Sequence, residues 1–366
     1  MFRIHLLPAE DGDCLLAEVG SEENSFRILI DGGRRSTLPA MLSLICRLPT
    51  REGPPVDLLV LSHVDADHIE GLLALVMGDD DFPVGEVWFN GLNHVRMASG
   101  QTHVAPTWPP PPAGSDGGAP VLGAGQALRF AARLHGRGWP WNKSFVGGPA
   151  MTTDGSALPS ASLPGGGRIV LLGPPQKKLA AFRQDMDGAF EQLTERSRAQ
   201  TLGGRKEPSP IRDVTALAAE RSSEDRTRPN GASITFVVEH DGKRALFCAD
   251  AHPEDLAAAL RLYAPDNPGR IRFDAVKVPH HGSARNNTAA LIDHLESPRW
   301  LISTDGSRNG HPDPQAIARI VLAGPSHKEL VFNYKSAFSS EWDRGDLKTR
   351  YGYSTRFLYP GTPVEI

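Results

Sequence analysis

A stretch between positions 58 and 72, LLVLSHVDADHIEGL, combines side chains that bind metals with the elements that would hold them. Four apolar residues at 58–61 predict a short buried strand, and apolar residues at spacings of three and four from Ile69 predict a helix. Between the two lie four ligand-type side chains: His63, Asp65, Asp67 and His68. A strand end fixes the backbone, so short imidazole and carboxylate side chains from one loop can converge on ions a few Å apart.

An alternative interpretation is an acidic helix N-terminus, in which Asp65 and Asp67 only cap the helix and interact with its dipole. That interpretation accounts for one aspartate but not for two aspartates flanked by two histidines. The stretch therefore predicts a metal site where a strand passes into a helix.

Other predicted strands also end in acids or histidines. Strand-like runs at 26–31, 244–249, 273–278 and 300–303 are followed by, or end in, these side chains: Asp31, Asp250, His280, His281 and His311. Further strands are predicted at 2–7, 14–19, 84–89, 168–172, 232–240, 330–333 and 355–359. Helices are predicted at 38–48, 126–134, 177–198, 253–263, 288–295 and 312–322.

Two groups of strands and helices, each delivering ligands to one rim, predict an α+β fold. We expect two mixed sheets packed face to face with helices outside, an αββα sandwich. Between the halves, residues 94–228 begin with a Pro/Gly-rich run and end with a polar run, so we interpret them as an insertion or cap within a single domain of 1–366.

Composition places the chain among globular proteins: 366 residues, 40% hydrophobic and 22% charged. The three cysteines are far apart in the sequence, and no signal peptide or membrane span is evident, which favours a reduced, cytoplasmic protein without membrane partners. The net charge of −4 is uneven, because 94–228 carries 17 Lys/Arg against 11 Asp/Glu. A basic segment beside an acidic, metal-binding centre suits a phosphate-bearing substrate, although a chance fluctuation in a loop-rich segment is the alternative.

Several of these motifs resemble those of a known family. SHVDADHIEGL resembles the HxHxDH loop of the metallo-β-lactamase superfamily, with Asp65 in place of the second histidine. EDGDCLLAEV, KVPHHGS and NGHP resemble motifs of the branch that contains the nuclease-like domain of the competence protein ComEC, and the pattern is also similar to choline-phosphate esterases. Together these motifs cover about 1–92 and 230–322.

The resemblance implies roles for individual residues. It implies two divalent ions, Zn²⁺ or Mn²⁺, with Asp250 as the shared ligand and these metal ligands: His63, Asp65, Asp67, His68, Asp250 and His281. Asp31 and Asn230 would support the ligands from behind. Asp67, His280 and His311 are the candidates for orienting water, for acid–base catalysis or for contacting the substrate. We expect an extended chain at the adjacent His280 and His281, which would turn His280 to the side opposite the ligand His281.

One departure from the family pattern bears on the metals. The superfamily has a histidine ahead of the strand that leads to the shared acid, and here that position reads RPNGAS, with Asn230 the nearest polar residue. A carboxylate-rich site tilts metal preference from zinc alone towards Mn²⁺ or mixed metals. His311 could supply the missing imidazole.

These features predict a metal-dependent hydrolase that acts on a phosphoester, most simply a phosphodiesterase or nuclease for nucleic acids or nucleotides. A carbonyl ester or lactone hydrolase is an alternative, because water activated by two metals also attacks carbonyl carbon. Lys277 and Arg285 are the phosphate-binding candidates near the rim. A regulatory module with a residual metal site, in which 94–228 binds a partner protein, is the third interpretation.

Overall fold

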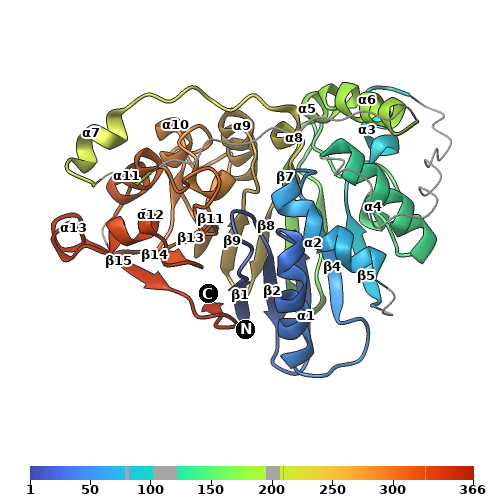
Figure 1. The fold of residues 1–366 in the computed structure, drawn as a ribbon, viewed down its shortest axis with the longest axis horizontal. Helices are drawn as coiled ribbons and strands as arrows, with labels where there is room; N and C mark the ends of the chain where they lie inside the picture. The colour runs from blue at the N-terminus through green and yellow to red at the C-terminus, as the bar shows by residue number, and fades with distance from the viewer. Residues whose placement is uncertain (79–81, 102–122, 195–206, 209, 326) are drawn as a thin grey trace.

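The structure is a computed structural model. It describes residues 1–366 except 79–81, 102–122, 195–206, 209 and 326. Two large sheets occupy the centre of the molecule, and the two chain ends lie near each other at one end of them (Figure 1).

The first sheet has six strands in the order β16-β1-β2-β3-β4-β5. Their bounds are β1 Phe2–Leu6, β2 Leu15–Gly20, β3 Ser25–Ile30, β4 Val56–Val60, β5 Val84–Trp88 and β16 Val364–Glu365. β1, β2 and β3 pair antiparallel, whereas β3, β4 and β5 run parallel. Parallel strands deliver the loops that follow them to the same edge of a sheet.

The second sheet has eight strands in the order β15-β14-β13-β11-β9-β8-β7-β6. Their bounds are β6 Ser160–Ser162, β7 Arg168–Gly173, β8 Thr235–His240, β9 Lys243–Phe247, β11 Ala275–Lys277, β13 Arg299–Ile302, β14 Lys328–Phe332 and β15 Tyr353–Phe357. From β9 to β15 the neighbours are parallel, and β6 to β9 are antiparallel. A short parallel pair, β10 Ile271–Arg272 and β12 Leu295–Glu296, lies beside this sheet.

Alternating side chains along each strand divide the core into layers. On β4, Leu58 and Val60 belong to the cluster between the sheets, while Leu59 belongs to the cluster beneath the helices. The same alternation places Phe236 and Val238 of β8 between the sheets and Val237 on the outer face. With helices on both outer faces, the αββα sandwich predicted from the sequence is confirmed.

Helices cover both outer faces (Figure 1). Against the first sheet pack α1 Leu38–Arg47, α2 Ala66–Met77, α3 Leu92–Ala98, α4 Ala124–Arg137, α5 Gln176–Ala181 and α6 Arg183–Thr194. Against the second pack α7 Val214–Ala219, α9 Pro253–Tyr263, α10 Ala289–Ile292, α11 Pro314–Leu322 and α13 Gly345–Tyr351. α8 Arg228–Gly231 precedes β8, and α12 Ala337–Ser340 follows β14. Among the described residues, no helix is long and apolar enough to span a membrane.

The segment 94–228 contributes to both the sheet and the helical layer. Its strand β7 pairs along β8, and its helices α4, α5 and α6 supply buried residues to the first outer cluster. Ile169 and Leu171 of β7 pack between the two sheets. The role of this segment as a cap over the site stays a prediction.

Sequence patterns located several elements with the wrong bounds and missed some short helices. The strand expected over 273–278 is only Ala275–Lys277, and the helix expected over 288–295 is only Ala289–Ile292. The helix expected over 177–198 divides into α5 and α6 around Phe182, and its last positions, 195–198, lie outside the described residues. The helices α3, α7 and α13 were not predicted. Such short elements depend on tertiary pairing, because their own periodicity covers too few residues to be recognised.

The packing of α4 predicts that 94–228 is coupled to the global stability of the fold. Phe130 of α4 is fully buried and meets the Phe89 ring at a centroid distance of 5.3 Å. Phe130→Ala should lower the free energy of unfolding by about 3–5 kcal/mol, because it leaves a cavity in a shared core. Chemical denaturation followed by tryptophan fluorescence measures this. Exposed Arg133→Ala on the same helix is the matched control, and a Phe130→Ala midpoint equal to that of the control would mean that the helix is energetically separate.

Candidate metal centre

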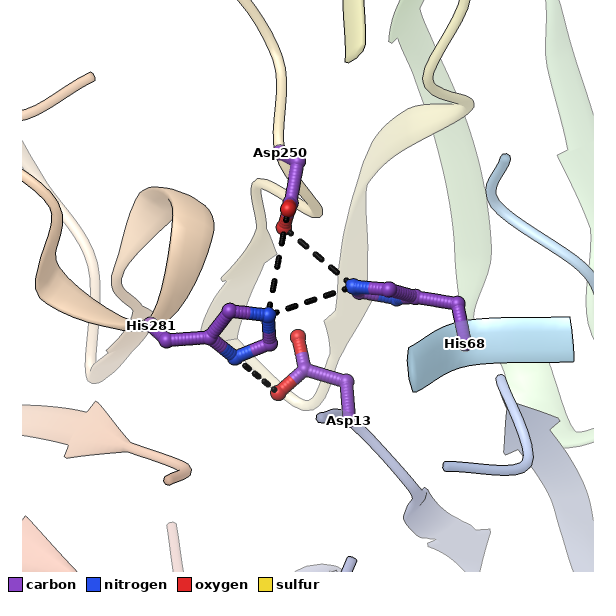
Figure 2. A group of neighbouring side chains, drawn as sticks. All are labelled: Asp13, His68, Asp250 and His281. Atoms are coloured by element: carbon purple, nitrogen blue, oxygen red, sulfur yellow. Dashed lines mark hydrogen bonds and ion pairs between the residues drawn. The ribbon is translucent and has the colours of Figure 1, made fainter. Parts of the chain in front are cut away.

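The carboxylate of Asp250 lies at the meeting point of four histidines. It follows β9, is 2% exposed, and faces the Nε2 atoms of all four imidazoles. The distances from Asp250 oxygens to Nε2 are 3.8 Å for His63, 3.5 Å for His68, 3.5 Å for His280 and 3.8 Å for His281. Figure 2 shows Asp250 above the rings of His68 and His281, with Asp13 below them and in contact with His281.

The loops of the first sheet hold their histidines through Asp31. This carboxylate accepts hydrogen bonds from the Ser62 backbone N–H at 2.7 Å and from Ser62 Oγ at 2.6 Å. It also lies 2.8 Å from His68 Nδ1, in the first turn of α2. Gly32 allows this approach, because a Cβ there would lie 2.3 Å from the Leu72 backbone nitrogen. Asp31 therefore joins the loop after β4 to the His68 ring, and its role in supporting metal ligands stays a prediction.

Each of the four imidazoles has an oxygen at its Nδ1 atom. These partners are Ser62 Oγ for His63 at 3.1 Å, Asp31 Oδ2 for His68 at 2.8 Å, Asn286 Oδ1 for His280 at 2.9 Å and the Ser303 carbonyl for His281 at 2.9 Å. An Nδ1–H that donates to such an oxygen leaves the lone pair of Nε2 free. This is the arrangement that orients histidine ligands in metal sites.

Two observations fit these residues to metal ions. His63 Nε2 and Asp250 Oδ1 are buried and have no hydrogen-bond partner, which is costly unless a cation satisfies them. His68 Nε2 lies 3.2 Å from His281 Nε2, close to the roughly 3.4 Å that separates two nitrogens bound tetrahedrally to one zinc-like ion at about 2.1 Å. Asp13, His68, Asp250 and His281 each offer a ligand atom within 4.8 Å of the others.

The two aspartates of the α2 loop lie at the same centre. Asp67 Oδ2 is 3.4 Å from His281 Nε2, and Asp65 Oδ2 is 3.8 Å from His63 Nε2. His311 lies beside His280 at a ring centroid distance of 5.5 Å, and its nearest carboxylate is Asp313 at 3.6 Å. The structure thus brings together every histidine and aspartate that the sequence placed at the site.

Burial and mutual charge shift the pKa values of these groups. Burial lowers the pKa of His63 to about 3, and the neighbouring His68 acts in the same direction. Burial would also lower the pKa of His281, but the carboxylates of Asp13 and Asp250 outweigh it and raise this pKa to about 10. Burial and the charges of Asp67 and Asp250 raise the pKa of Asp65 to about 7. The pKa of each group thus depends on the charge of its neighbours, as expected where several metal-binding side chains lie close together.

The backbone at 279–282 differs from the extended chain that we expected. A 3-10 turn spans Pro279–Gly282, and His280 and His281 have φ values of 45° and 52°. An extended chain would have pointed the two rings to opposite sides. Instead, this left-handed turn directs both Nε2 atoms toward Asp250, so that part of the interpretation was wrong.

Lys277 does not face the rim. It is 1% exposed, and its Nζ lies 2.7 Å from Asp13 Oδ2. Arg285 donates to the backbone carbonyls of Ser223 and Glu224 at 3.2 Å each. Both residues expected to bind phosphate are therefore engaged in structural contacts.

Residues that sequence reasoning did not assign to the site also contact it. Asp13 Oδ1 is 3.4 Å from His281 Nδ1, and Asp225 Oδ2 is 3.5 Å from His280 Nδ1. Asp13 belongs to the EDGDCLLAEV motif, which was a usable signal, whereas Asp225 and Asn286 carried none. A second group of ligand-type side chains, His252, Glu254 and Asp255, surrounds the Lys178 ammonium at 2.9–3.1 Å, so a cation already occupies its centre.

Comparisons with known proteins give similarity at the level of structure alone. No family model and no curated protein matches the sequence. Zn²⁺-bound PqqB from Methylobacterium extorquens is 13% identical with a TM-score of 0.41, over 97% of this chain and 88% of that chain. Tm1679, described as a metal-dependent hydrolase of the β-lactamase superfamily, is 14% identical with a TM-score of 0.39, over 100% and 99%. YhfI from Bacillus subtilis, described as a metallo-β-lactamase fold protein, is 10% identical with a TM-score of 0.36, over 100% of both chains. Similarity of this degree assigns neither a family nor a reaction, and the functional conclusion depends on the geometry of the site.

The buried ion pair between Lys277 and Asp13 predicts a structural role for Lys277. Lys277→Met should lower the free energy of unfolding by about 3–5 kcal/mol, because it leaves the Asp13 carboxylate buried without its cation. The double variant Asp13→Asn/Lys277→Met should recover part of this loss, and thermal and chemical denaturation measure both. An unchanged stability together with a raised KM for anionic substrates would return Lys277 to the substrate-binding role.

Proposed function

We propose that this protein is a metal-dependent hydrolase of the metallo-β-lactamase type, with two divalent ions, Zn²⁺ or Mn²⁺, sharing Asp250. The observation that carries the proposal is the convergence of four oriented Nε2 atoms from both halves of the chain on that one buried carboxylate. A place near the ComEC-type branch, which the KVPHHGS stretch suggests, is part of the same proposal.

The contacts gather these side chains in two groups. Asp65 lies 3.8 Å from His63, whereas His281 lies 3.2 Å from His68 and 3.4 Å from Asp67. The first group would hold one ion and the second group the other. Two such ions, when bound, supply a nucleophile from water at neutral pH and neutralise charge that develops on the substrate. His311 lies beside His280, at a ring centroid distance of 5.5 Å, and has a buried Nδ1 without a hydrogen-bond partner, which suits proton transfer to a leaving group.

A phosphoester is the substrate class that we propose, and a basic cavity near the centre supports it. This cavity of about 440 Å³ is lined by three cationic side chains and one acid, Lys178, Arg226, Arg228 and Glu254, together with Ala181, Gly231 and His252. Its link to the histidine cluster is through Asn230, the neighbour of Gly231, whose Nδ2 lies 3.3 Å from His280 Nδ1. Within it, Lys178 pairs with Glu254 and Arg228 pairs with Asp185, which leaves Arg226 as the exposed cation for an anionic group. A nucleic acid or a nucleotide fits this chemistry.

A carbonyl ester or lactone hydrolase is the second candidate. The structural engagement of Lys277 and Arg285 favours it, because both were expected to bind phosphate at the rim. A partner protein bound through 94–228, a purely regulatory role and a cytoplasmic location remain predictions from the sequence.

The metal content of purified protein tests the centre itself. We expect about two divalent ions per chain by elemental analysis. Asp250→Ala should lose both ions, because all four Nε2 atoms face this carboxylate, and His63→Ala should lose mainly one. Exposed Asp266→Ala is the matched control and should keep both. An active wild-type preparation without metal would contradict the proposal.

A substrate screen on the same preparations tests the reaction. Wild-type protein with Mn²⁺, Zn²⁺ or Mg²⁺ is offered single- and double-stranded nucleic acids, cyclic nucleotides, bis-p-nitrophenyl phosphate and lactones, and Asp250→Ala serves as the inactive reference. Hydrolysis of phosphodiesters supports the proposal. Turnover of lactones or esters alone would favour the carbonyl hydrolase.

The basic cavity predicts how binding of an anionic substrate depends on charge. Arg226→Glu should raise the KM for a phosphodiester about tenfold with little change in kcat, since a reversed charge near the ligand costs on the order of 1 kcal/mol in a partly exposed site. Exposed Arg272→Glu on β10 is the control and should leave KM unchanged. Equal effects of the two variants would indicate that only net charge matters.

A further inference from the structure

The position at which the resemblance leads one to expect a metal-binding histidine holds a different kind of residue in this chain. Asn230, in α8 ahead of β8, donates from Nδ2 to Asp225 Oδ2 at 2.6 Å. The same Nδ2 lies 3.3 Å from His280 Nδ1. Asn230 is 3% exposed and contacts the imidazole of His280, although it does not itself supply the expected histidine.

His280 reaches from the loop after β11 to Asp250 Oδ2, the oxygen that His63 and His281 also face. Its Nε2 is 3.5 Å from that atom, and those of His63 and His281 are 3.8 Å from it. His281 Nε2 lies nearer to His68 Nε2, at 3.2 Å, and to Asp67, at 3.4 Å, so His280 is the imidazole of this loop that is left for the ion beside His63. The left-handed turn at His280 and His281 produces this direction. It is held by hydrogen bonds from His280 N to the Ala249 carbonyl at 2.8 Å and from Ser283 N to the His280 carbonyl at 2.7 Å. Two consecutive left-handed residues other than glycine are strained, and such strain persists where a site requires it.

A group of polar side chains fixes the other edge of the His280 ring. Asn286 Oδ1 lies 2.9 Å from Nδ1, and Asp225 Oδ2 lies 3.5 Å from it. Asp225 is itself fixed by the Thr227 backbone N–H and hydroxyl at 2.9 Å each, by Asn230 and by Asn286 at 3.1 Å. Asn286 also donates to the backbone carbonyl of Asp250 at 3.0 Å, so the ring and the shared carboxylate are positioned by one side chain.

We propose that His280 is the imidazole ligand of the ion held by His63 and Asp65, in place of the histidine that this chain lacks ahead of β8. Asp225, Asn230 and Asn286 act as its positioning residues. This inference rests on the proposed metal centre, and it moves His280 from acid–base catalysis to metal binding. His311 is then the imidazole left for proton transfer.

The chain thus makes up for the histidine that it lacks ahead of β8, and it takes two of its imidazoles from one loop. Because His280 and His281 are adjacent, their loop serves both ions, and its left-handed conformation becomes a requirement of the metal site. The carboxamide of Asn230, which cannot replace an imidazole well as a ligand for zinc-like ions, instead helps to hold Asp225 against the new ligand.

Metal stoichiometry and affinity distinguish the two roles of His280 without reference to activity. His280→Ala should retain about one ion per chain by elemental analysis, and its Co²⁺ form should lose about half of the visible absorbance. His311→Ala is the matched control, and it should keep two ions and the wild-type Co²⁺ spectrum. His280→Gln is made in parallel, and circular dichroism of the metal-free proteins establishes that both variants fold.

A positioning variant extends the test. Asp225→Asn should lower the affinity for the second ion about 10–100-fold in competition with a chelator, while two ions still bind at saturation, as expected when a partner behind a ligand is weakened. Two ions bound by His280→Ala and His280→Gln with wild-type affinity would overturn this proposal and leave the metal centre standing. A wild-type protein that binds no metal would overturn both.

Discussion

The structure depends on one constraint: a single buried carboxylate, Asp250, must meet four imidazoles that arrive from two different sheets. This is possible because the relevant strands run parallel. β3 and β4 deliver Asp31 and His63 to one edge of the first sheet, and β9, β11 and β13 deliver Asp250, the histidine pair and Ser303 to one edge of the second. Face-to-face packing of the sheets then brings the two edges together over a common core.

The convergence requires unusual backbone at each loop. Asp31, Ala249, His280 and His281 all have positive φ values, between 43° and 58°, although none is glycine. Each such residue costs roughly 1–2 kcal/mol relative to ordinary conformations. Backbone hydrogen bonds hold these residues in place, among them Asp31 N to the Val60 carbonyl and His280 N to the Ala249 carbonyl, both at 2.8 Å. Left-handed residues gathered at one centre indicate that the fold gives up some stability for the placement of ligands.

Much of this arrangement could be predicted from the sequence, because strand ends and ligand types lie in the same short stretches. The loop from His63 to His68 and the pair His280–His281 were recognisable as site residues for that reason. The direction of the His280 ring was not predictable, since it depends on a left-handed turn that no residue-type preference suggests. Asp225 was missed because it belongs to a polar segment with no periodicity, and its role depends on contacts with residues far along the chain, His280 and Asn286, the latter 61 positions later. The strands β6 and β7 were hard to place in the second sheet for a similar reason. The pairing of β7 with β8, and of β6 with β7, depends on tertiary structure and not on local sequence.

The turn at residues 7–13 shows how the two halves are kept in register at the centre. Several contacts join this turn of the first sheet to the second, among them Lys277 with Asp13 at 2.7 Å, Ser303 Oγ to the Gly12 carbonyl at 2.8 Å, Asn333 Nδ2 to the Leu7 carbonyl at 2.9 Å and Asp305 N to the Glu10 carbonyl at 2.8 Å. Gly12 also lies against the Asp67 carbonyl so closely that a Cβ would come within 1.9 Å of its oxygen. The turn therefore touches α2 on one side and β11 and β13 on the other.

Since Asp13 also faces His281 Nδ1, a shift of one sheet against the other would change the orientation of that imidazole. The buried Lys277–Asp13 pair thus couples the packing of the sandwich to the geometry of the metal centre, which accounts for a lysine in the core of a strand that ends in two histidines.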